Sequence, residues 1–145
     1  MFLGQFNHTI DAKGRLTVPA RFRAPLAEGA YVTLGFDRNL FVYTKESFAR
    51  LSEKAGSLSA TNPEARAVRR VIFGGATEVG LDSAGRILLP PFLREYGALK
   101  SDATIVGAGD YFEIWDSDAW NAELHSVTDP EANARRFADF DLSAG

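Results

Sequence analysis

The sequence predicts an α+β fold, dominated by β-strands, in which two similar units form one barrel with peripheral helices. The first observation is a near repetition, because IDAKGRLTVP at 10–19 returns as LDSAGRILLP at 81–90. The second is that the likeness continues past one inserted residue, so the copies span roughly 5–51 and 76–123. The third is size: a unit of about 45 residues buries too little surface to be stable alone. Exposed strand edges then favour pairing of the two copies into one closed barrel.

Each copy begins with a strand that enters a D-x-x-G-R turn. In such a turn the Asp side chain bonds the backbone two residues on, and Gly supplies a positive φ. A short strand leaves each turn, at 15–18 and 86–89, and stops at a proline. Because proline loses no hydrogen bond at the first helical position, short helices are predicted at 19–27 and 90–97, with Gly97 ending the second.

Two further strands, a tight turn and a helix complete each copy. The expected strands and helices are 30–36, 40–43 and 45–55 in the first copy, and 103–108, 111–115 and 117–124 in the second. The alternation of apolar residues in YFEIW is typical of a half-buried strand. Thr44 and Asp116 are the expected N-caps of the two helices.

The remaining segments lie between and after the copies. Residues 56–75 are expected to form a loop and then a helix, with Asn62 as its cap, Pro63 at its first position and a Gly-Gly end. A last helix is expected at 130–140. The predicted bounds are 5–51 for the first copy, 52–75 for the linker, 76–123 for the second copy and 124–145 for the helix and acidic tail.

The charges are segregated along the chain. The net charge is −3, yet residues 1–54 hold 8 basic against 5 acidic residues, and residues 100–145 hold 3 against 10. This distribution fits a basic face that meets nucleic acid, and it fits equally well a solvated acidic helix and tail.

Several classes of protein are disfavoured. No run of about 20 apolar residues is available for a membrane span, and the N-terminus lacks a secretory signal pattern. The chain has no cysteine and two histidines, without metal-ligand or triad spacing, and no phosphate-binding G-x-x-x-x-G-K motif. We therefore expect a cytoplasmic protein that is not an enzyme and has no metal or cofactor.

The pairs Asp11–Arg15 and Asp82–Arg86 admit three interpretations. As exposed turn-closing ion pairs they contribute about 0–1 kcal/mol each. As catalytic acids they lack a second group that sets their pKa values apart. As a DNA-binding surface they bring two arginines, the commonest specific readers of guanine, under an approximate two-fold axis. The residues expected at that surface are Arg15, Arg86, Lys13, Arg21, Arg23 and Arg94, with Asp11, Asp82, Gly14 and Gly85 orienting the two turns.

These residues carry a resemblance to a known family. The unit of D-x-x-G-R, apolar strand, Pro and short helix is similar to the AbrB/SpoVT swapped-hairpin DNA-binding domain. Two such units behind the N-terminus MFLGQFNHTIDAKGRLTVP resemble the MraZ family. The resemblance implies a pseudo-dimeric swapped-hairpin barrel and a ring of roughly eight to twelve subunits. It also implies a transcriptional regulator, usually a repressor, associated with the nucleoid and binding direct promoter repeats of the division and cell-wall gene cluster.

The second copy departs from the first at two basic positions. Phe92 stands where Arg21 stands, and Ala84 stands where Lys13 stands, so Arg15 is expected to matter more for DNA affinity than Arg86. A different class of function also fits the charge segregation. It is an assembly module, without direct DNA reading, whose basic and acidic parts meet head to tail.

Overall fold

The strands and helices follow the same order in both copies: two strands, a short helix, two strands and two further helices. A computed structural model describes residues 1–144. Its strands are β1 (Gln5–Thr9), β2 (Arg15–Thr17), β3 (Ala30–Leu34), β4 (Leu40–Thr44), β5 (Thr77–Val79), β6 (Arg86–Leu88), β7 (Asp102–Gly107) and β8 (Tyr111–Asp116). Its helices are α1 (Ala20–Arg23), the 3₁₀ turn η1 (Ala24–Leu26), α2 (Lys45–Gly56), α3 (Pro63–Ile72), α4 (Pro91–Tyr96), α5 (Ser117–Val127) and α6 (Pro130–Arg136).

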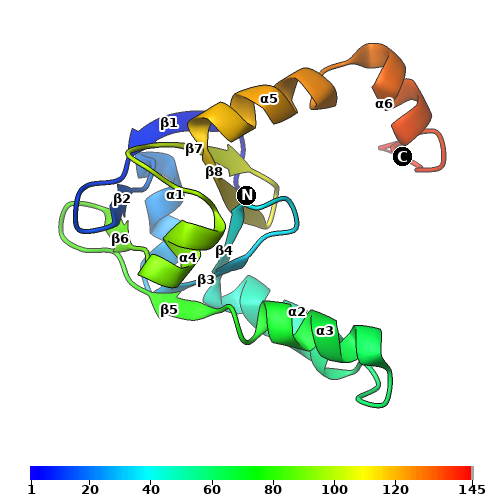
Figure 1. Ribbon diagram of the computed structural model, residues 1–145, viewed down its shortest axis with the longest axis horizontal. Coiled ribbons are helices and arrows are strands. Elements are labelled where there is room, and N and C mark those ends of the chain that lie inside the picture. Colours follow the sequence, from blue (N-terminus) through cyan, green and yellow to red (C-terminus); the bar gives the residue numbers. More distant parts are fainter. Residues whose placement is uncertain (145) are drawn as a thin grey trace.

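Strands of the two copies are interleaved in one antiparallel sheet. Its order is β1-β7-β8-β4-β3-β5, while β2 and β6 form a separate antiparallel ribbon (Figure 1). The first strand of each copy pairs inside the other copy's part of the sheet, because β1 lies beside β7 and β5 lies beside β3. The α+β class and the duplicated organisation are therefore confirmed.

The closed barrel predicted from the sequence is not found among residues 1–144. Strands β1 and β5 are the two ends of the six-stranded sheet, and the β2–β6 ribbon pairs separately from it. A single bridge between Ile10 and Leu16 joins the start of the ribbon to the end of β1. Beyond this bridge β2 leaves the sheet and pairs with β6 of the other copy.

The main core fills the space between the inner face of the sheet and the ribbon. Leu16 and Ile87 point inward from the ribbon and are 0% and 1% exposed. Phe22 of α1 lies at the centre, with its ring centroid 5.0 Å from that of Phe2 and 5.2 Å from that of Phe112. Burial of apolar surface is the dominant favourable term in folding, and aromatic rings bury a large area each.

A second cluster lies on the opposite face of the sheet under α2 and α3. It contains Phe41 and Tyr43 of β4 together with Phe48 and Ile72 of the two helices. Because Leu40 and Val42 belong to the main core, β4 is buried on both faces. The centre of the sheet is thus fixed from both sides.

The expected helix caps are confirmed. The side chains of Thr44, Asn62 and Asp116 accept hydrogen bonds from the backbone of the first helical turns that follow them. Pro19 and Pro90 differ from expectation, since each precedes its helix as the N-cap residue. The last helix ends at Arg136 and not at 140, consistent with the absence of any buried residue in α6.

Removal of the central ring tests this description of the core. We expect Phe22→Ala to lower the free energy of unfolding by about 3–5 kcal/mol, because it leaves a cavity among aromatic neighbours. Phe92→Ala is the matched control, since Phe92 is 59% exposed and its loss is expected to change stability by about 0.5 kcal/mol or less. Urea unfolding of both variants checks the difference, and equal losses would contradict it.

Candidate nucleic-acid interface

The β2–β6 ribbon brings the two repeated motifs together although they lie far apart in the sequence. Arg15 pairs with Leu88, Leu16 with Ile87, and Thr17 with Arg86. Since successive side chains of a strand alternate between its faces, Leu16 and Ile87 enter the core while the outer pairs face away from it. Both arginines therefore lie on one outward surface.

Asp11 closes the first turn with three hydrogen bonds. Its Oδ1 accepts from the backbone N–H of Lys13 at 3.0 Å and of Arg15 at 2.9 Å. Its Oδ2 accepts from Nε of Arg15 at 2.7 Å. One carboxylate thus shapes the turn and orients the arginine that follows it.

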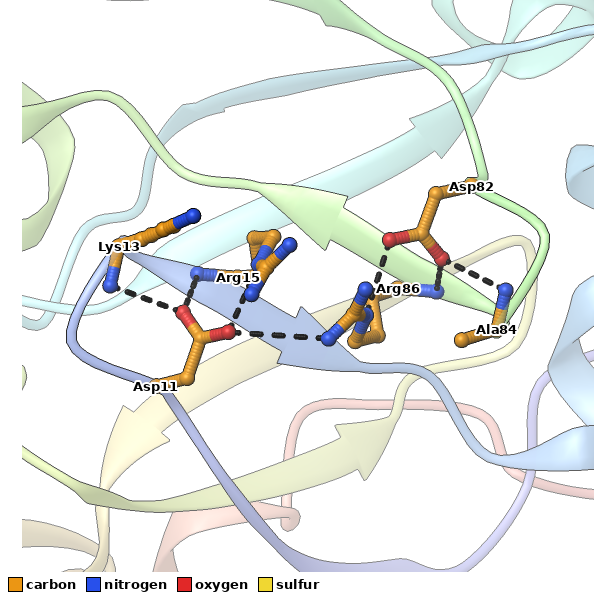
Figure 2. Close-up of polar contacts among 6 residues, drawn as sticks. All are labelled: Asp11, Lys13, Arg15, Asp82, Ala84 and Arg86. Atoms are coloured by element: carbon orange, nitrogen blue, oxygen red, sulfur yellow. Dashed lines mark hydrogen bonds and ion pairs between the residues drawn. The ribbon is translucent and has the colours of Figure 1, made fainter.

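The second turn repeats this geometry and is joined to the first. Asp82 accepts from the backbone N–H groups of Ala84 and Arg86 and from Nε of Arg86, each at 2.9 Å. In addition, Nη1 of Arg86 lies 3.7 Å from Oδ2 of Asp11 (Figure 2). Each Asp thus bonds the Arg of its own turn, and Asp11 also contacts the arginine of the other copy.

Both arginines remain accessible. The side chain of Arg15 is 33% exposed and that of Arg86 is 31% exposed. Ion pairs of this exposure contribute little to stability. The network is better suited to hold two guanidinium groups in fixed positions at the surface.

Each turn is fastened by the other copy. The carbonyl of Gly14 accepts a hydrogen bond from the N–H of Leu89, and the carbonyl of Gly85 accepts one from Val18, both at 2.9 Å. The two glycines have φ of +86° and +75°, a region that other L-residues rarely adopt. A side chain at Gly14 would also collide with Arg94.

Arg23 and Arg94 have positioning contacts that the sequence did not indicate. Nε of Arg23 donates to the carbonyl of Val18 at 2.8 Å, and Nε of Arg94 donates to that of Leu89 at 3.0 Å. Each arginine thereby holds the strand end that binds the turn of the other copy. The sequence hinted at this role only by placing the two arginines at equivalent positions of the repeat. Their contact with DNA remains a prediction.

The other expected residues are more exposed. Lys13 lies at the tip of the first turn, and Arg21 lies on α1 with its guanidinium carbon 5.8 Å from the ring centroid of Phe6. Sequence reasoning missed Leu88, which is 56% exposed on the outer face of the ribbon beside Arg15. Strict alternation from the buried Ile87 would have found it.

The hydrogen bonds within the turns lower the pKa values of the two aspartates. Hydrogen bonds from the backbone of Arg15 lower the pKa of Asp11 from its ordinary value of 3.8, with further contributions from the Arg15 side chain and the Lys13 backbone. The backbone of Arg86 lowers the pKa of Asp82 in the same way. Both carboxylates are therefore charged at neutral pH.

Within residues 1–144 the side chains form no cluster of three or more His, Cys, Asp or Glu groups that could hold a metal ion. No helix in the described part of the chain has the length and apolarity needed to cross a membrane.

The fold and this surface define an internally duplicated α+β protein that presents two Asp-held arginines on a shared two-stranded ribbon. The family model described as "MraZ protein, putative antitoxin-like" matches the chain twice, over residues 1–71 and 72–140. The chain belongs to the MraZ family. Each matched segment extends beyond the copy predicted from the sequence, which ended at 51 or 123. The predicted bounds of the two copies and of the linker remain predictions.

Proteins named "Transcriptional regulator MraZ" resemble this chain over nearly its full length. The one from Thermomicrobium roseum is 50% identical over 137 residues, which cover 93% of this chain and 96% of the relative. The one from Heliobacterium modesticaldum is 46% identical over 143 residues, covering 98% and 100%. The one from Herpetosiphon aurantiacus is 46% identical over 129 residues, covering 89% and 90%.

Substitution of the turn glycines tests the interlocked geometry. We expect Gly14→Ala and Gly85→Ala to lower the free energy of unfolding by about 1–3 kcal/mol each, because of the positive φ and the arginine packed against each glycine. Gly80→Ala is the control, since nothing lies within 4 Å of a Cβ there. Thermal or urea unfolding measures the three variants, and a loss at Gly80 as large as at Gly14 would argue against the turn geometry.

The lowered carboxylate pKa values predict an acid dependence of stability. A group whose pKa is depressed by folding stabilises the protein above its ordinary pKa, here 3.8, and this contribution disappears as pH falls through the folded value. The free energy of unfolding of wild type relative to Asp11→Asn should therefore be constant near neutral pH and shrink below pH 3.8. Urea unfolding over a pH series checks it, and a difference that grows on acidification would contradict the assignment.

Proposed function

We propose that this protein is a transcription regulator that binds duplex DNA through the β2–β6 ribbon. The observation that carries the proposal is the pair of surface arginines, about a third exposed and each held by an aspartate, on one two-fold ribbon. A two-stranded ribbon fits the major groove of B-DNA. The name of the MraZ relatives, transcriptional regulators, supports the same role.

The aspartates prepare the arginines for recognition. An arginine can bond O6 and N7 of guanine with two donors, provided that its guanidinium plane is correctly oriented. Asp11 engages Nε of Arg15, and Asp82 engages Nε of Arg86. This restricts side chains that otherwise lose rotamer entropy on binding, which is a source of affinity without new contacts.

The surrounding basic residues supply contacts with the phosphates. Lys13 and Arg21 are exposed in the first copy, where the second copy has Ala84 and Phe92. Phosphate contacts position a protein on DNA, and base contacts specify the sequence. The first copy is thus the stronger anchor, and Arg15 contributes more to affinity than Arg86.

Oligomerisation completes the proposed mechanism. A single chain with net charge −3 binds DNA weakly, because few phosphates are neutralised. A ring of subunits that engages successive direct repeats makes later contacts intramolecular and raises affinity by roughly 10²–10⁴. In this proposal the chain is a pseudo-dimer of swapped hairpins that acts in the cytoplasm, at the nucleoid. It represses the division and cell-wall gene cluster, its own promoter included.

Substitution of the ribbon arginine tests the DNA contact. Arg15→Ala should weaken binding to the chain's own promoter by about 1–3 kcal/mol while the melting temperature stays close to wild type. Lys13→Ala should weaken binding to all sequences and lower the slope of log K against log salt by about 1. Arg50→Ala, on the exposed face of α2, is the control. A variant of Arg15 that melts early but binds normally would assign the pair to the turn alone.

Repeat number tests the avidity mechanism. The bound site is first located by footprinting on the promoter of the chain's own gene. Binding is then measured to duplexes with one and with four tandem copies of that site, and the proposal expects about 10²-fold or tighter binding to the longer duplex. Equal affinities would exclude avidity. Failure to bind either duplex more tightly than scrambled DNA would favour the assembly module without DNA reading.

A further inference from the structure

The last helix of each half begins with nearly the same sequence. NPEA at 62–65 starts α3, and DPEA at 129–132 starts α6. In both helices the first of these residues caps the N-terminus and proline takes the first helical position. The two helices therefore hold the same place in the duplicated unit.

In the first half this helix is packed on the sheet. Ala65 and Ile72 of α3 are buried, at 6% exposure each. The hydroxyl of Thr33 in β3 donates to the carbonyl of Val71 at 3.2 Å or of Ile72 at 3.0 Å. The end of α3 is thus anchored over the outer face of β3.

In the second half the helix is not packed in this way. Within residues 1–144, α6 has no buried residue, and its side chains bond back to the end of α5. Nδ2 of Asn133 donates to the carbonyl of Val127 at 2.8 Å, and Nη2 of Arg136 donates to Oγ of Ser126 at 2.9 Å. Figure 1 shows α6 projecting away from the sheet beyond the end of α5.

The strand register gives a reason for this difference. Val106 of β7 lies opposite Glu113 as Thr33 of β3 lies opposite Phe41. A valine therefore takes the position of the hydroxyl that holds α3. The half-buried Glu113 takes the position of Phe41, an aromatic residue of the second cluster. The sheet surface that would receive α6 therefore lacks both the hydroxyl and the aromatic ring that α3 packs on.

The segment that follows α6 presents apolar and acidic side chains together. Phe137, Phe140 and Leu142 are 44%, 66% and 73% exposed. Residues 137–144 also contain Asp139 and Asp141 and no basic residue. We call residues 137–144 the arm.

A surface of complementary character lies on the α2–α3 pair. Leu58, Val68 and Phe73 are each 39% exposed there. Helix α3 also carries Arg66, Arg69 and Arg70. Arg69 holds the α2–α3 loop by donating to the carbonyls of Gly56 and Leu58 at 2.7 and 3.0 Å. We call this the hairpin surface; apolar side chains among arginines match the chemistry of the arm.

We propose that the arm of one copy of this chain docks on the hairpin surface of a second copy. In Figure 1 the C-terminus beyond α6 lies at the upper right and the α2–α3 pair at the lower right, apart from each other, so the arm is free to reach a neighbour. Because donor and acceptor surfaces differ, the contact is head to tail, and it closes a ring where the rotation between copies permits. This inference rests on the ring assembly of the proposed function, and it leaves the ribbon uncovered.

Disulfide trapping tests the contact directly, because the native chain has no cysteine. The double variant Phe140→Cys with Val68→Cys is oxidised and its covalent mass is read by non-reducing electrophoresis. Docked thiols meet at an effective concentration of about millimolar, so a ladder about ten-fold stronger than in the control is expected. The control combines Phe140→Cys with Leu88→Cys, an equally exposed apolar position on the ribbon. The two single variants should give dimers at most.

Three results would overturn the inference: a disulfide bond formed within one chain, a ladder equally strong in the control, or no ladder.

A second measurement uses a variant that lacks residues 137–145. The native mass by light scattering should fall below that of the full chain, while the melting temperature stays unchanged. A ladder without promoter binding would refute the proposed DNA function and support the docking. Promoter binding together with a native mass that the truncation leaves unchanged would support the DNA function and refute the docking.

Discussion

The fold depends on the exchange of hydrogen bonds between the two D-x-x-G-R turns. Each turn is shaped by its own aspartate, but its glycine carbonyl is bound by the strand end of the other copy, through Leu89 or Val18. Arg23 and Arg94 then hold those strand ends by their carbonyls. Each turn therefore has contacts that only the other copy supplies. The ribbon, the inner wall of the core and the paired arginines are therefore one cooperative unit.

Features that rest on local chemistry could be predicted from the sequence. The bonds of Asp11 to its own turn and the caps of Thr44 and Asn62 join residues two to four apart, so the residue types suffice. The partner of β2 could not be predicted, because a strand of three residues fits β1 or β6 equally well. That choice depends on the packing of the whole core, and it opened the sheet where a closed barrel was expected.

The candidate site shows the same division. Two arginines after two aspartates indicated the surface, and the structure brings them together. Charge alone could not separate arginines that face solvent from arginines that hold the backbone. Nε of Arg94 reaches a carbonyl five residues back, a contact that exists only because α4 turns against the end of β6. Leu88 was hidden for the opposite reason, since an apolar residue in a strand is usually expected inside.

Fusion of the two copies in one chain has a consequence for symmetry. A homodimer repeats every substitution on both sides of its axis, whereas a fused pair can change one side only. Here Thr17 and Leu88 take equivalent places on the ribbon, and only one of two equivalent helices is packed on the sheet. Identical halves favour palindromic sites. A ribbon with unlike halves has polarity, so in the proposed DNA complex it would distinguish the two directions along a duplex.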